Sequence, residues 1–136
     1  MAVDRKMPRV QEIVLPLLRE QLPEVVITSW IPDPDNRSFP LLNIRRLGGV
    51  PVDPERLDRA VLEISAFSRD GLVATEDLYL DARTVLYRAV RNQAVTPAGS
   101  LSSFTENVGP TALDSPFEDT WRVQGLIQVG IRPPRI

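Results

Sequence analysis

The placement of proline constrains this chain more than any other sequence feature. Thirteen of the 136 residues are proline, and none of them lies between Glu55 and Thr96. Proline fixes φ and has no backbone N–H to donate, so it interrupts helices and the interior of sheets. The sequence therefore predicts that the regular centre of the fold lies in this proline-free block.

Two elements are predicted inside the block. Apolar and polar residues alternate around Leu62, Ile64 and Ala66, which predicts a strand over residues 60–68. A helix follows, with Asp70 as its expected N-cap, acidic residues early and arginines late, as the helix dipole favours. Its apolar stripe consists of Ala74, Leu78, Ala82, Val85, Leu86 and Ala89.

Upstream of the block, the spacing of the apolar residues from Val10 to Leu18 predicts one helix, kinked at Pro16 and ended by Pro23. Residues 25–30 and 39–47 are predicted strands, joined by the turn-forming stretch 31–38. An antiparallel pair is the simplest arrangement for them.

Downstream of the block, residues 93–100 are expected to form turns and residues 101–108 a weaker strand. Alternation predicts a long final strand over residues 121–132, and the prolines in the tail, 133–136, cannot continue a sheet. The length fits a single domain over residues 1–136, with residues 1–6 mobile. We expect an α+β fold of order α-β-β-β-α-β-β, with one mostly antiparallel sheet of four or five strands and two helices packed on one face.

Composition argues against catalysis and against a cofactor. The chain has no cysteine and no histidine, so the commonest nucleophile–base pairs and zinc ligands are missing. A net charge of −2 does not favour tight binding of nucleic acid through phosphate groups. No spanning segment or signal peptide is evident, which predicts a protein that remains in the cytoplasm where it is made.

The acidic stretch PDPDN suggests a calcium loop only weakly. Asp33, Asp35 and Asn36 are interrupted by Pro34, and neither a turn glycine nor a closing glutamate follows at the required spacing. An Asx-type turn is the favoured interpretation, so no metal site is predicted. The serines have no histidine beside them, and Lys6 is the only lysine, so no catalytic residue is predicted either.

Arg45 and Arg46 are the first candidate interface residues. They lie near the end of the predicted strand over residues 39–47 and point to opposite faces, because side chains alternate along a strand. Arg46 could lie at the sheet margin and reach outward to solvent. Alternatively, one of the two arginines could pair with an acidic group on a neighbouring subunit.

The second candidate is the long connection over residues 111–120, which ends beside Trp121. It carries Phe117 among the acidic residues Asp114, Glu118 and Asp119. Long connections with apolar anchors often contact partners. Phe117 could equally fold back onto its own domain.

Three segments together resemble the tail terminator proteins of long-tailed, siphovirus-type bacteriophages. They are FPLLNIRRLGG, the passage from LEISAFSRD into TEDLYLDARTVLYRAV, and NVGPTALDSPFEDTWRVQGLIQVGIRP. The resemblance implies a virion protein, assembled in the host cytoplasm, that forms a hexameric ring on the head-proximal end of the tail tube. There it would stop tube polymerisation and meet the head-completion protein, while DNA passes through the lumen without specific binding. It implies no catalytic residue.

Ring closure requires two different complementary patches on each subunit. One hypothesis pairs a basic patch of Arg45, Arg46 and Arg122 with an acidic patch of Asp114, Glu118 and Asp119, supported by the apolar contacts of Phe117 and Trp121. Another head–tail connector or tail-tube ring protein is an alternative within the same class. A cellular peptide-binding module is an alternative outside it, and an enzyme is the weakest of the three.

Overall fold

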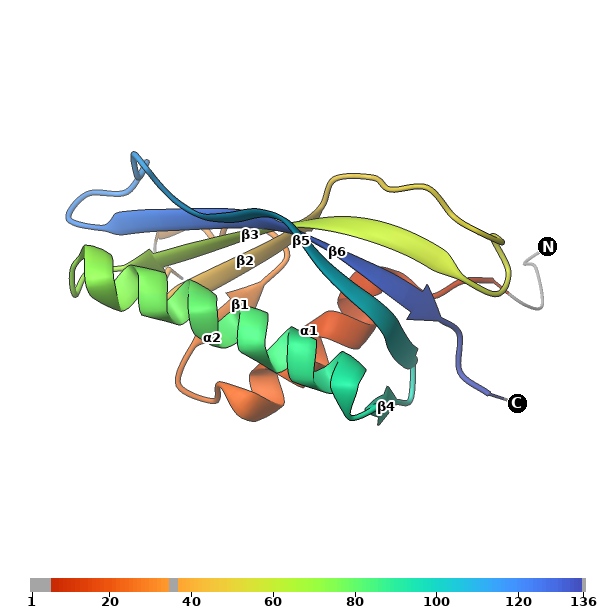
Figure 1. Cartoon of the computed structure of the whole chain (residues 1–136). Helices are drawn as coiled ribbons and strands as arrows, with labels where there is room; N and C mark the ends of the chain where they lie inside the picture. The colour runs from red at the N-terminus through yellow and green to blue at the C-terminus, as the bar shows by residue number, and fades with distance from the viewer. Residues whose placement is uncertain (1–5, 35–36, 136) are drawn as a thin grey trace.

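The computed structural model describes residues 6–34 and 37–135 and shows one curled sheet with both helices on the same side (Figure 1). Most of the segment expected to be mobile, residues 1–6, lies outside the described residues, since only Lys6 is described. The turn residues Asp35 and Asn36 also lie outside them. The elements in chain order are α1 (Val10–Gln21), β1 (Val26–Thr28), β2 (Leu41–Arg46), β3 (Asp58–Ser68), α2 (Leu72–Arg91), β4 (Val95–Thr96), β5 (Gly99–Leu113) and β6 (Trp121–Arg132).

The sheet has six strands in the order β1-β2-β3-β6-β5-β4, so the predicted count of four or five was too low. The additional strand, β4, has only two residues and lies in the segment predicted to be turns. Two residues are too few to show the period of two that identifies a strand in a sequence. As a result, the observed order of elements also differs from the predicted one.

The predicted antiparallel pairing of the first two strands is wrong, because β1 and β2 are parallel. Val26 lies opposite Leu41, and the Val26 N–H donates to the Pro40 carbonyl over 3.0 Å. The chain after β1 returns to the beginning of that strand before β2 starts, which a tight hairpin could not do. The sheet is therefore mixed, and its other pairs are antiparallel.

β5 continues beyond the predicted strand, through Gly109 and Pro110 to Leu113. Its register against β6 shifts at three places, and one of these shifts spans Pro110. Such irregularities let an edge strand accommodate a proline that a regular ladder would exclude. The connection to β6 is consequently shorter than predicted and covers residues 114–120.

The core lies between the helices and the sheet face that they cover. Tyr79 of α2 is fully buried against Gly125 of β6, where an added Cβ would lie 2.0 Å from the tyrosine Oη. Four of the six predicted stripe residues of α2 are buried, whereas Ala74 and Val85 are partly exposed. The N-cap of α2 is Gly71 instead of Asp70, and Asp70 donates its N–H to the Ser68 Oγ.

Candidate interaction surfaces

The helix-free face of the sheet carries an aromatic cluster, which we define as Phe39, Phe67 and Phe117. The Phe117 ring centroid lies 5.0 Å from that of Phe67 on β3 and 6.0 Å from that of Phe39. Aromatic pairs at these separations and tilted angles attract each other beyond the burial of their area. Of the two alternatives for Phe117, the structure shows the ring folded back onto its own domain.

Three arginines surround the aromatic cluster. The Arg37 guanidinium carbon lies 4.0 Å from the Phe117 centroid, that of Arg69 lies 4.9 Å from Phe39, and that of Arg122 lies 5.8 Å from Phe67. A guanidinium over a ring face is attracted by the ring quadrupole. Within residues 6–34 and 37–135, no ion pair involves these three arginines. The three arginines are therefore positioned by ring contacts, with added hydrogen bonds from Arg37 to the Pro32 carbonyl and from Arg122 to Gln124.

The loop over residues 114–120 is held in shape by its own hydrogen bonds. The Phe117 N–H donates to the Ser115 Oγ over 3.2 Å, and the Thr120 hydroxyl donates to the Phe117 carbonyl over 2.8 Å. Asp114, Glu118 and Asp119 are all exposed on this ordered loop. The predicted acidic residues thus lie on a defined surface.

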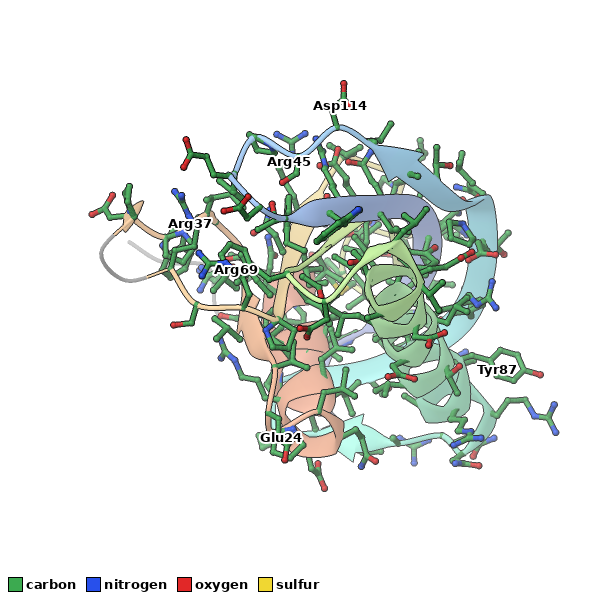
Figure 2. The ribbon with its side chains drawn as sticks, turned by 90° about the vertical axis from the view of Figure 1, so that its left-hand side faces the viewer. Glu24, Arg37, Arg45, Arg69, Tyr87 and Asp114 are labelled. Carbon is green, nitrogen blue, oxygen red and sulfur yellow. The ribbon has the colours of Figure 1, made fainter. Side chains whose placement is uncertain are left out.

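Arg45 lies on this helix-free face and pairs with Glu63, the residue opposite it on β3, over 3.1 Å. It lines a shallow pocket together with Phe117 and Arg122. Figure 2 shows Arg37, Arg45 and Arg69 on the same side of the molecule, with Asp114 above them. The structure therefore brings two of the predicted basic residues, Arg45 and Arg122, onto one surface with the predicted acidic loop.

Arg46 is separated from the other predicted residues, because its side chain leaves the opposite face of β2. It lies at the sheet margin, where its Nη1 donates to Asp58 over 3.0 Å. It also donates to the carbonyls of Gly48, over 2.9 Å, and Arg59, over 3.3 Å. Arg46 therefore joins the end of β2 to the beginning of β3, and it holds together the base of the segment over residues 47–57.

Sequence reasoning missed a buried polar group on the other face. The Tyr79 hydroxyl donates to the Glu106 Oε2 over 2.8 Å, and Arg83 donates to the Glu106 Oε1 over 3.1 Å. Burial, reinforced by the bond to Glu106, raises the pKa of the Tyr79 hydroxyl. One feature of the sequence could have indicated this polar group, because Glu106 is the only charged residue between Gly99 and Leu113.

Neither a metal-binding cluster nor a membrane-spanning helix is found among the described residues. No three His, Cys, Asp or Glu side chains among them gather in a way that could hold a metal ion. None of the helices in this part of the chain has the length and apolar character needed to span a membrane.

A comparison with family models identifies the family of this chain. A family model described as "Phage tail termination protein" matches residues 6–136. The Gene 22 protein of Mycobacterium phage D29 is 50% identical over 133 residues, covering 95% of this chain and 96% of that protein. The Gene 22 protein of Mycobacterium phage L5 is 48% identical over 134 residues, covering 96% of each. Among solved structures, a chain from the virion of a native gene transfer agent particle matches with a TM-score of 0.47 and 14% identity, covering 90% of this chain and 94% of that one.

Proposed function

The chain belongs to the phage tail termination protein family, whose members are structural proteins of the tail, and from this premise we propose that it forms a ring on the head-proximal end of a tail tube. The ring stops further polymerisation of the tube and provides the joint to the head. In this proposal the protein acts by shape and makes or breaks no covalent bond. It belongs to the virion and is assembled in the host cytoplasm.

The exposure of both tryptophans is the observation that supports this proposal most directly. Trp30 is 68% exposed and Trp121 is 43% exposed, and the chain contains no other tryptophan. Tryptophan is strongly buried on average in folded domains, and it is enriched at the centres of protein interfaces. A subunit that leaves both of its tryptophans outside the core is suited to burying them against other proteins.

We propose that the helix-free face contacts the proteins stacked above or below the ring. This surface combines Arg45, Arg122 and Phe117 with the acidic loop residues Asp114, Glu118 and Asp119, whereas Trp121 precedes Arg122 on β6 and alternates to the other face of the sheet. The partners are the tail tube protein on one side and the head-completion protein on the other. Mixed charge with aromatic anchors suits a contact that must fix orientation as well as affinity.

The proposed ring contains six copies, and DNA passes through its lumen without specific binding. The net charge of −2 suits a channel wall that must not bind the passing DNA tightly. Arg46 forms its ion pair within its own chain, so its role in the proposed ring is to support the segment over residues 47–57.

Particles assembled without this protein test the proposal. Electron microscopy should show tail tubes of irregular length detached from filled heads, because nothing would stop tube growth. Tubes of normal length that merely fail to join heads would overturn termination and favour the second candidate, a neighbouring head–tail connector ring. In particles supplied with the protein, a single copy per tail would overturn the ring itself.

A further inference from the structure

The segment over residues 47–57, which joins β2 to β3, forms an ordered projection that we call the apolar loop. The N–H groups of Val52 and Asp53 both donate to the Leu57 carbonyl over 3.0 Å, and the Leu57 N–H donates to the Asp53 carbonyl over 2.9 Å. At its base, Gly49 has a φ of 113° and an added Cβ would lie 2.1 Å from the Arg59 carbonyl oxygen. The loop arches over the helix-free side of the sheet near the chain termini (Figure 1).

The apolar loop exposes aliphatic side chains that its own domain does not cover. Val50 is 76% exposed and Val52 is 57% exposed, with Leu47 also exposed at the base. Pro51 and Pro54 limit the conformations of the loop. Preorganised apolar side chains lose little conformational entropy on binding, so they are well suited to an interface.

A groove lies at the β4 edge of the sheet, and we call it the C-terminal groove. It runs between the end of α2, the β4–β5 turn and the tail that follows β6. Val95 on its rim is 78% exposed. The lining residues that matter here are Val90, Val95, Pro97, Leu101, Arg132 and Arg135.

The loop and the groove complement each other in chemistry. The groove combines aliphatic walls with Arg132 and Arg135, and none of the described residues that line it is acidic. The apolar loop carries Asp53 and Glu55 beside its exposed valines, and these outnumber Arg56. Aliphatic side chains can therefore fill the groove while carboxylates meet its arginines, which fixes the register of the contact.

The two features are separate surfaces of one subunit. The loop leads into the start of β3 and the groove lies at the start of β5, and the end of β6 runs between them, with Ile131 opposite both Asp58 and Leu101. A ring forms when one surface of each copy meets a different surface of the next copy. We propose that the apolar loop of each subunit docks in the C-terminal groove of its neighbour. This inference rests on the proposed ring, since it assigns the lateral contact that closes it.

The absence of cysteine from the chain allows a direct test by cross-linking. The double variant V52C/V95C places one thiol on the loop and one in the groove. Each subunit can then join two neighbours, so a short bismaleimide should give a ladder of covalent multimers. The single variants V52C and V95C should stop at dimers.

The matched control is V52C/V73C. Val73 lies at the start of α2, and at 74% exposure it is as accessible as Val95. The ladder from V52C/V95C should form at least about tenfold faster than that from the control, because adjacent groups experience effective concentrations in the millimolar range. Equal rates for the two pairs would overturn the docking contact.

The mass of each uncross-linked variant, measured by analytical ultracentrifugation at the same concentration, separates the two levels of the proposal. A ring-sized mass without a V52C/V95C ladder would overturn the loop-to-groove contact and leave the ring intact. A monomeric mass without a ladder would overturn both. A ring-sized mass with the fast ladder supports both.

Discussion

The two faces of the sheet are built from different kinds of contact. The helix-covered face is continuous and mostly aliphatic, and residues such as Ile44, Ile64 and Ile127 are fully buried there. The helix-free face instead holds its loops through the aromatic cluster and the arginines over it. Close-packed aliphatic contacts determine stability, whereas ring and guanidinium contacts leave charge and ring edges available to a partner. The fold and the proposed contact surface therefore depend on largely separate residues.

The largest expected effect comes from Ile64→Ala on the helix-covered face. Ile64 is fully buried between Ile44 and Gly125 on the neighbouring strands, so truncation leaves a cavity that the strands cannot close. We expect the free energy of unfolding to fall by about 3–4 kcal/mol, measured by urea denaturation. Val61→Ala, on the same strand but the other face, is the control and should cost less than half as much. Equal losses would break the comparison between the two faces.

An intermediate effect is expected for Phe117→Ala on the helix-free face. Phe117 is partly exposed, so we expect a loss of about 2 kcal/mol, below the cost of truncating a fully buried phenylalanine. Hydrogen exchange should increase locally, in residues 29–34, 37–40 and 114–120, because Phe117 joins these two loops. Leu113→Ala, at an exposed neighbouring position, should leave this exchange unchanged. Faster exchange throughout the sheet would show that the two faces are not separate.

The helix-covered face was the more predictable of the two. Its residues recur with the periods of a helix and a strand, so the stripe on α2 could be recognised, and the predicted bounds of the last strand match β6. The parallel pairing of β1 was not predictable, because strand direction depends on the path of the segment between β1 and β2. The two-residue β4 was too short to show any period.

The candidate surface was predictable only in part, for a related reason. Phe117 and Arg122 were identified because they lie in or beside a long connection. Arg37 and Arg69 were not, because their ring partners belong to segments far away in the sequence. Cation–π pairs between loops follow no period, so they appear only when the loops are placed in space. The same applies to Tyr79 and Glu106, which meet between α2 and β5.

The smallest expected effect concerns this buried Tyr79, and it sharpens the comparison by giving the helix-covered face a pH dependence. Tyr79→Phe removes the bond to the Glu106 carboxylate and should cost about 1.5 kcal/mol at neutral pH. Because the pKa of Tyr79 is raised in the folded state, the folded chain keeps this proton where the unfolded chain loses it. The stabilisation of the folded chain that comes from this raised pKa is therefore fully present below the ordinary tyrosine pKa of 10.0, and it is lost as the pH rises above that value.

Urea denaturation between neutral pH and pH 11 measures this effect. The stability of the parent protein should decline above about pH 10, and that of Tyr79→Phe should decline less steeply. Tyr87→Phe is the matched control, since Tyr87 is the only other tyrosine and lies exposed on the same helix. It should follow the parent curve. If Tyr79→Phe also followed the parent curve, the alkaline decline would belong to other groups, and the buried hydroxyl would not bind its proton more tightly in the folded chain.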